Sequence, residues 1–193
     1  MSTHNMANTW YQEQLQNKNY LSPIGFVFLL DKAPKTSFLC QKAVIPDMTL
    51  GTANVPTRGM VSIPMDGNVV YGELTLQFIV DEDLKNYLEL HNWIRALGQP
   101  AYMGERMEWR EQYNSKTWDG QDPKFSDGTL QVLNNNNRLN FNVVFEDMFP
   151  TQLSTLDFDV TGGDQEYFTA SATFNYTFYE IRNKLNKRIK TSE

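Results

Sequence analysis

Two histidines and one cysteine are the side chains that could serve as a base or a nucleophile. A catalytic serine needs a base with an orienting partner, and His91 is the only histidine within the predicted fold. His91 falls on the apolar stripe of a predicted helix, so we expect a packed, hydrogen-bonded core histidine. Cys40 has apolar neighbours in a predicted strand, which favours a buried, inert thiol. A single cysteine also excludes an internal disulfide and a zinc site built on several thiolates.

Carboxylates are the other groups that could do chemistry. A pair of them can hydrolyse a glycosidic bond, and Glu105, Glu108 and Glu111 are spaced for one helix face. Three like charges at that spacing are more typical of a solvated surface. The aspartates at 119–127 lack the spacing of a calcium loop, and no glycine-rich phosphate loop opens a helix. The sequence therefore predicts no active site, no metal and no cofactor, with a calcium site in the loop of Asp119, Asp122 and Asp127 as an open alternative.

Composition is that of a globular chain of about one domain. The 193 residues are 40% hydrophobic and 13% aromatic, and this aromatic content argues against intrinsic disorder. The longest apolar run, residues 24–30, is far shorter than the roughly 20 residues of a membrane helix. The first residues show neither the basic nor the apolar region of a secretory signal. We expect no membrane segment.

Charge is distributed unevenly along the chain. There are 17 basic and 23 acidic side chains, net −6. Residues 182–193 hold five basic side chains against Glu193, net +4, which leaves 12 basic and 22 acidic side chains, net −10, in residues 1–181. An acidic body repels nucleic-acid phosphates, because affinity for DNA rests on basic side chains. The basic tail is expected to be a solvated helix, or a contact for an acidic partner or nucleic acid.

Most of the chain is predicted to be strand. Alternating apolar and polar residues mark a strand with one buried and one wet face, and residues 73–80 and 168–178 show this most clearly. The continuous apolar run at 24–30 predicts a strand buried on both faces. Further strands are expected at 37–44, 139–146 and 156–160.

A long hairpin and one helix complete the core. Residues 47–72 carry Gly and Pro among β-formers, which predicts an irregular hairpin with its turn near 65–68, where Asp66-Gly67 suits a tight turn. A helix is predicted over 82–97, with Asp81 as N-cap and Gly98 at C′. Its apolar stripe recurs every three or four residues: Leu84, Tyr87, Leu88, His91, Ile94 and Leu97.

The predicted organisation is one β domain, residues 20–181, with three additions. These are an N-terminal arm (1–19), a partly helical insertion at about 101–135, and the basic C-terminal tail (182–193). Long two-faced strands leave edges that a soluble protein must cover, pair or close into a barrel, and a closed ring of copies would pair them. A monomeric β-sandwich remains an alternative.

Two other functions remain open from the residues alone. One is a β-sandwich module that binds or acts on glycans, with Trp109 and Trp118 of the insertion as its platform. The other is an enzyme that uses acidic residues of the insertion.

An ordered set of motifs resembles a known family. Residues 38–46 read F-x-C-x-x-A-x-x-P at the end of a predicted strand. The hairpin of 47–72, the strand 73–80 and the helix follow, and later the strand 139–146 runs into Phe149-Pro150. The last strand ends in Tyr176-Thr-Phe-Tyr179. In this order the segments resemble the tail tube proteins of contractile-tailed bacteriophages of the T-even type.

The resemblance implies a mainly β, antiparallel sandwich or barrel-like fold with one flanking helix (about 82–97) and a long hairpin (about 47–80). It implies hexameric rings that stack around a channel, through which DNA passes without specific binding. The implied partners are other copies, the tail sheath protein, the baseplate and the tape-measure protein. The implied location is the virion tail, after synthesis in the cytoplasm of the bacterial host. A baseplate-proximal tube or tube-initiator protein is the alternative role.

Three groups of residues are the expected contact sites. Ring or stacking contacts are expected at the hairpin: Pro56, Arg58, Met65, Asp66 and Asn68. The polar faces of the clearest strands are expected to line the channel: Glu73, Thr75, Gln77, Thr169, Ser171 and Thr173. Contacts to exterior partners are expected from the insertion and the tail: Trp109, Trp118, Lys187 and Arg188.

Overall fold

The computed structural model describes residues 19–56, 59, 62–102, 104–114, 124–159 and 167–189. The described elements are mainly strands joined in antiparallel pairs, as predicted. The strands are β1 (Phe26–Leu30), β2 (Cys40–Ala43), β3 (Met48–Pro56), β4 (Ser62–Tyr71), β5 (Leu74–Ile79), β6 (Ser126–Leu133), β7 (Leu139–Leu153), β8 (Thr169–Asn175) and β9 (Phe178–Asn183). The helices are α2 (Pro34–Phe38), α3 (Lys85–Gly98) and α4 (Glu105–Asn114).

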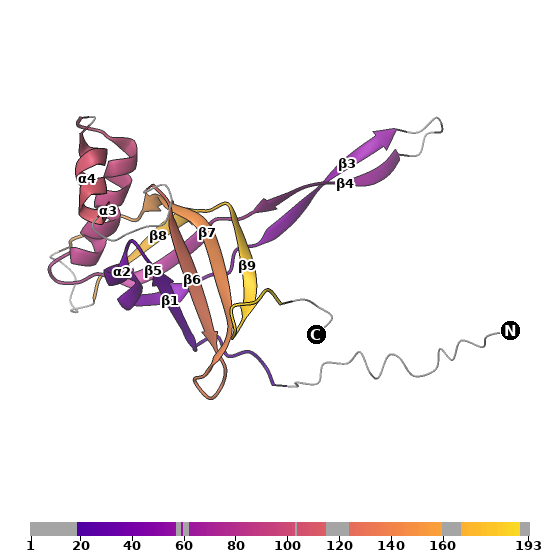
Figure 1. Ribbon diagram of the computed structural model, residues 1–193, viewed down its shortest axis with the longest axis horizontal. Helices are drawn as coiled ribbons and strands as arrows, with labels where there is room; N and C mark the ends of the chain where they lie inside the picture. Colours follow the sequence, from indigo (N-terminus) through magenta and orange to yellow (C-terminus); the bar gives the residue numbers. More distant parts are fainter. Residues whose placement is uncertain are drawn as a thin grey trace.

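Seven strands form the body and two form a projecting hairpin (Figure 1). The body sheet has the order β1-β6-β7-β8-β5-β2, with β9 paired to β7 next to β8. Its end strands, β1 and β2, contact each other, so the sheet curls toward a barrel. The hairpin β3–β4, which we call the arm, extends from the body along the longest axis of the molecule. The predicted fold class is confirmed.

The core fills the inside of the curled sheet. Alternate residues of the strands point inward, and the bulky aromatic side chains among them are no more than 1% exposed: Phe28, Phe78, Phe145 and Phe174. Helix α3 covers the core with Trp93, which is 1% exposed and lies against Phe174 at a ring distance of 6.3 Å. Burial of each such side chain contributes roughly 1.5–3 kcal/mol.

The long C-terminal strand is present in two segments. β8 pairs with residues 149–153 of β7 and β9 with residues 141–146. The break lies where Asp147 of β7 takes a left-handed conformation with φ 56°, and its neighbour Glu146 accepts the Thr177 N–H at 3.0 Å. β7 is also longer than the predicted strand 139–146, because it continues to Leu153.

Three strand predictions are wrong in part. The first strand is buried on one face only, with Val27 and Leu29 42% and 43% exposed, because nothing covers the outer face of this end strand among the described residues. The segment 37–44 begins inside α2, where Pro34 supplies a helical first residue, so β2 is short. Residues 156–159 form no strand.

The predicted insertion contains a strand of the body. β6 alternates strictly between buried and half-buried residues and pairs with both β1 and β7. The chain that departs from the sheet is therefore shorter than 101–135 and includes α4. Asp127 and Gly128, a pair common in turns, lie within β6. A side chain at Gly128 would clash with the Met148 sulfur, 2.4 Å from an added Cβ.

Helix α3 confirms the predicted helix but buries a different face. Its buried residues are Asn86, Leu90, Trp93 and Ala96. His91 is exposed and Leu88 is 45% exposed, so the prediction of a core histidine is wrong.

The ends of α3 also differ from prediction. The N-cap is Leu84 in a left-handed conformation rather than Asp81, and Gln99 rather than Gly98 takes that conformation at the C-terminal end. The buried Asn86 amide donates to Ile79 O at 2.7 Å and accepts the Asp81 N–H at 3.2 Å. These bonds fix the entry of the helix.

Candidate assembly surfaces

The polar residues predicted to share a strand face do share one. In the β5–β8 ladder Thr75 lies opposite Thr173 and Gln77 opposite Ser171, and cross-strand partners point to the same side of a sheet. Thr169 of β8 continues this face, and Glu73 lies directly before the first residue of β5. Lys42 of β2 and Gln152 of β7 extend it on either side. We call this surface the polar sheet face.

The arm is a second surface, and its turn lies elsewhere than predicted. β3 ends at Pro56 and β4 begins at Ser62, so Met65, Asp66 and Asn68 lie within β4 rather than in the turn. Arg58 lies outside the described residues. Asp66-Gly67 instead belongs to a bulge, where Asn68 and Gly67 of β4 stand opposite Gly51 of β3. A Cβ on Gly67 would lie 2.9 Å from the Gly51 carbonyl oxygen, so this close approach requires glycine.

The bulge gives the distal half of the arm one apolar face. Beyond it, Ala53 pairs with Met65 and Val55 with Ile63, while Thr52, Asn54 and Pro56 pair with Asp66, Pro64 and Ser62 on the opposite face. In an unbulged ladder Met65 would lie opposite Asn54, and the apolar residues would be divided between the two faces. We call the set Ala53, Val55, Ile63 and Met65 the distal apolar face.

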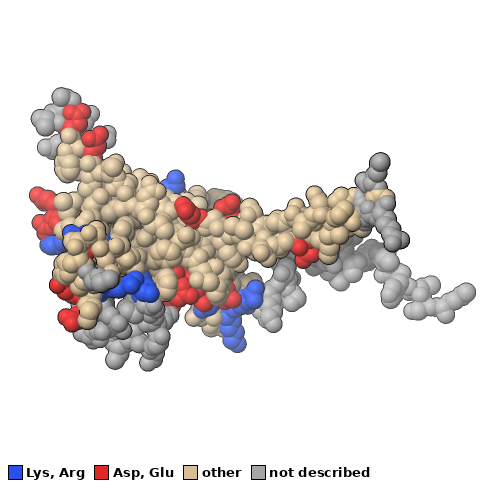
Figure 2. All heavy atoms as spheres, turned by 90° about the horizontal axis from the view of Figure 1, so that it is seen from above, with Lys and Arg blue, Asp and Glu red and all other residues tan. Residues whose placement is uncertain are grey.

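The arm is exposed over nearly its whole length. Val55, Ile63 and Met65 are 43%, 53% and 52% exposed. Asp66 is the only charged residue in β3 and β4, and Figure 2 shows the arm as an almost uncharged projection. An exposed apolar ribbon of this kind is typical of a protein-binding surface.

Three tyrosines fix the base of the arm to the body. The Tyr71 ring lies 6.2 Å from that of Tyr176 and 5.4 Å from that of Tyr179. The Tyr176 hydroxyl donates to Gly72 O at 2.8 Å, and the Tyr179 hydroxyl donates to Pro46 O at 3.3 Å. Burial is the main cause that raises the pKa of Tyr176 to about 12. The direction of the arm is therefore determined by the β8–β9 segment.

Trp109, predicted to contact an exterior partner, is buried on the helical side of the body. Trp109 of α4 is 7% exposed and stacks on Trp93 with a ring distance of 6.2 Å. The ammonium of Lys32, itself buried, lies 5.4 Å from the Trp109 ring and donates to Phe125 O. Trp109 is thus a packing residue that holds α4, and it cannot serve as a surface platform. Trp118 lies outside the described residues.

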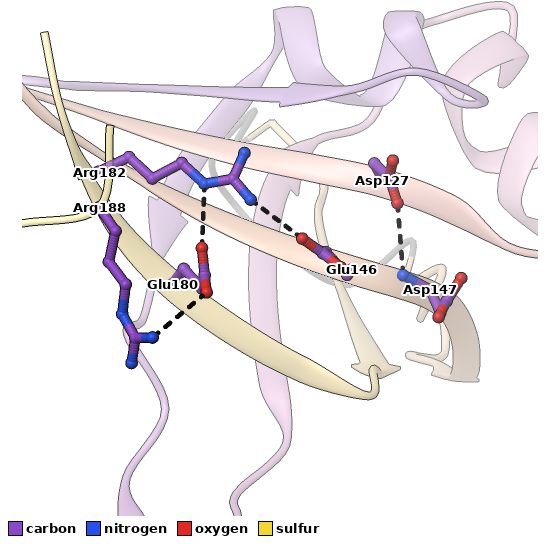
Figure 3. A network of polar contacts seen from close by, with 6 residues as sticks. All are labelled: Asp127, Glu146, Asp147, Glu180, Arg182 and Arg188. Atoms are coloured by element: carbon purple, nitrogen blue, oxygen red, sulfur yellow. Dashed lines mark hydrogen bonds and ion pairs between the residues drawn. The ribbon is translucent and has the colours of Figure 1, made fainter. Parts of the chain in front are cut away.

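The described part of the C-terminal tail, residues 182–189, folds back on the sheet instead of forming a helix. β9 extends to Asn183, residues 184–186 turn, and Arg188 forms a β-bridge with Arg182. In Figure 3 the Arg182 guanidinium lies between Glu146 and Glu180, at 3.0 and 3.2 Å. Arg188 reaches Glu180 at 4.0 Å, and Lys187 is exposed. Two charges of the basic tail, those of Arg182 and Arg188, are therefore paired with carboxylates of the sheet.

The described residues form no cluster of metal-binding side chains. No group of three or more His, Cys, Asp or Glu side chains lies close enough to hold a metal within the described ranges. Burial raises the pKa of the Cys40 thiol to about 11, so the thiol stays protonated at neutral pH, as expected of an inert cysteine. None of the described helices has the length and apolar character needed to cross a membrane.

Sequence reasoning missed two apolar surfaces. One is the distal apolar face, signalled by the apolar residues at 53, 55, 63 and 65, which pair only after a one-residue shift in register. The other surrounds Phe38, which is 86% exposed on α2. The motif F-x-C-x-x-A predicted a strand at this position, and a strand gives no reason to expect that Phe38 is exposed.

Comparison with solved structures finds the same fold in injection-system particles. A chain of the structure described as the anti-feeding prophage cap, a tube-terminating cap, has a TM-score of 0.61 at 16% identity, covering 92% of this chain and 99% of that one. A chain of an extracellular contractile injection system, in its sheath–tube complex in the extended state, has a TM-score of 0.59 at 16% identity, covering 86% and 93%. The sheath/tube terminator of that system gives 0.57 at 18% identity, covering 86% and 99%.

The comparison with curated proteins gives no match. The family model described as phage tail tube protein matches residues 7–182, which include the arm, the tyrosines at its base and all of the sheet except the last residue of β9. The chain therefore belongs to the phage tail tube protein family.

Proposed function

We propose that this protein is the structural subunit of a contractile tail tube and assembles as hexameric rings that stack around a channel. The observation that carries the proposal is the arm, which exposes an apolar face along a projection from the body. Burial of this face against other copies would remove the surface from water and stabilise the assembly. The end strands β1 and β2 would be protected in the same assembly.

The polar sheet face is the surface that we assign to the channel. Its side chains are mostly neutral and hydrogen-bonding: Thr75, Gln77, Gln152, Thr169, Ser171 and Thr173. A wall of this kind offers few cations to phosphate groups, and affinity for DNA depends on such cations. DNA would therefore pass without specific binding, and the acidic body agrees with this.

The proposed partners outside the tube are the sheath, the baseplate and the tape-measure protein. The sheath is supported by the similarity to a chain from a sheath–tube complex. The baseplate is supported by the similarity to a chain from a baseplate structure, with a TM-score of 0.54 at 14% identity over 82% of this chain and 91% of that one. Lys187 and Arg188, on the folded-back tail, are the exterior contacts that we retain. We propose no enzymatic activity, and a location in the virion tail after synthesis in the host cytoplasm.

Electron microscopy of the purified protein, over a range of concentrations and with and without baseplate components, tests the proposal. Rings with sixfold symmetry that stack into tubes are the expected result. Monomers alone under every condition, in images and in sedimentation, would refute it.

A protein at the end of the tube, a terminator or initiator, is the second candidate. The similarity to a tube-terminating cap over 92% of this chain favours it. The two roles differ in growth, because a main subunit extends tubes without limit whereas an end protein stops at one or a few rings. The length distribution in the same images separates them.

A further inference from the structure

Phe38 creates an exposed apolar surface on the side of the body opposite the arm. It ends α2 and is 86% exposed, and Val27 and Leu29 on the outer face of β1 are 42% and 43% exposed. In Figure 1 α2 and the arm lie toward opposite ends of the long axis. An exposed aromatic side chain that lies near other exposed apolar residues marks a candidate protein-binding surface.

Two hollows flank Phe38 and make it the ridge of a groove. One, of about 530 Å³, lies toward α3 and is lined by Pro34, Phe38 and Leu39, with Lys35, Asp81 and Lys85 among its other residues. The second, of about 430 Å³, lies toward β1 and is lined by residues 27–31, Pro34, Ser37 and Phe38. Phe38 and Pro34 belong to both, so the hollows adjoin. We call the two hollows and Phe38 the α2 groove.

The groove is held rigidly by the neighbouring helix. The Thr36 hydroxyl donates to Asn86 O at 3.1 Å, and the Lys35 backbone N–H donates to the Glu89 carboxylate at 3.1 Å. The Ser37 hydroxyl accepts the Leu30 N–H at 2.8 Å. A groove fixed in this way can accept an apolar partner without first becoming ordered, which lowers the cost of binding.

The arm matches this groove in chemistry and in placement. Its distal apolar face has no charged side chain, so it can enter the apolar centre of the groove without burying an unpaired charge. A projecting patch and a receiving groove at different places on one molecule make a head-to-tail contact, which closes into rings or continues as a filament. Both results agree with the proposed tube, on which this inference rests.

We propose that the α2 groove of one copy receives the distal apolar face of the arm of a second copy. Val55, Ile63 and Met65 then pack around Phe38, with Val27 and Leu29 along one wall. The opposite face of the arm, with Asn54, Ser62 and Asp66, stays outside the groove. The proposal thus assigns the two faces of the arm different roles, and it names the residue at the centre of the contact.

Cysteine cross-linking between two variants tests the contact directly. In a Cys40→Ser background, one copy carries Phe38→Cys and the other, with a size tag, carries Val55→Cys, Ile63→Cys or Met65→Cys. After oxidation with copper phenanthroline, we expect a hetero-dimer from at least one of these three positions, in at least tenfold excess over Asn54→Cys or Ser62→Cys. Phe158→Cys, at a site 71% exposed, replaces Phe38→Cys as the control for random collision. Equal yields from both faces, or from Phe158→Cys, would overturn the inference.

A charge exchange separates this inference from the proposed function. Met65→Glu and Phe38→Lys should each reduce tube formation at least tenfold, and the two variants together should recover part of it, because the new charges face each other. Circular dichroism and unfolding curves check that each variant is folded. Tubes that form normally with Phe38→Lys would refute the groove and leave the tube proposal intact. If the unaltered protein forms no tubes while the cross-link forms, the tube proposal fails and the contact stands.

Discussion

Replacement of Tyr176 by Phe removes one hydroxyl from the base of the arm. The Tyr176 ring keeps its place, because its contacts with Phe145, Tyr71 and Tyr179, at ring distances of 5.1, 6.2 and 6.2 Å, do not involve the hydroxyl. The 2.8 Å bond to Gly72 O is lost. A net hydrogen bond is worth about 1 kcal/mol, and because Gly72 is only half-buried, the loss of its donor adds little further cost. We expect a loss of about 1 kcal/mol in the free energy of unfolding, or about 2–4 °C in Tm for a chain of this size.

The pH dependence gives the same variant a second readout. The pKa of Tyr176 is about 12 in the folded protein against 10.0 for an ordinary tyrosine, so the unfolded chain releases this proton first as the pH rises. Stability contributed by the protonated phenol is complete below pH 10 and is lost as the pH rises toward 12. Tyr176→Phe should therefore lose less stability than the unaltered protein between pH 10 and pH 12.

Urea unfolding curves at pH 8 and at intervals up to pH 12 measure both effects. Tyr20→Phe is the matched control, because Tyr20 is 80% exposed and its replacement should change stability by less than 0.5 kcal/mol. Hydrogen exchange of the Gly72 amide, which donates to Asp47 O at 2.9 Å, should quicken as the base of the arm loosens. The reasoning would be refuted if Tyr176→Phe matched the unaltered protein in its free energy of unfolding at pH 8 and lost as much of it between pH 10 and pH 12.

Three further predictions concern the body. Phe174→Ala, at a core side chain with 0% exposure, should cost about 3–5 kcal/mol in urea unfolding, and a cost below 1 kcal/mol would contradict the packing described. Trp109→Ala should free α4 from Trp93, seen as faster proteolysis within residues 101–123 while the sheet keeps its far-ultraviolet dichroism; an unchanged cleavage rate would contradict its packing role. The Cys40 thiol, with a pKa of about 11, should react slowly with iodoacetamide at pH 8 and about tenfold faster per pH unit until pH 11, and fast reaction at pH 8 would contradict a protonated thiol.

The sheet was predictable wherever one face of a strand is apolar and the other polar. Residues 73–80 and 168–178 alternate in this way, and 74–79 and 169–175 within them form β5 and β8, each with its apolar face buried. The alternation in β6 was present but was outweighed by Asp127-Gly128, a pair usually found in turns. That pair fits in the strand because Gly128 leaves room for Met148, a contact between residues distant in sequence.

Local patterns failed where a distant contact determines the structure. The buried face of α3 differs from the predicted one because Asn86 is buried, where it forms hydrogen bonds with the chain that precedes the helix. A count of apolar periodicity places a polar residue such as Asn86 on the surface. The Asp66-Gly67 pair was placed at a turn because the dipeptide itself carries no information about Gly51, its neighbour across the ladder. Trp109 was taken for a surface residue because its partners, Trp93 and Lys32, come from other elements.

The bulge in the arm has a consequence for changes in chain length. It leaves one residue of β4 unmatched, so deletion of Asn68 would restore a regular ladder and keep Val55 opposite Ile63 and Ala53 opposite Met65. Since a bulge bends a strand and increases its twist, the same deletion would alter the direction in which the tip reaches. The arm can thus be re-aimed by single-residue insertions and deletions while the composition of its binding face is preserved. In the proposed tube, such a change would alter the rise and rotation between successive rings without any substitution on the distal apolar face.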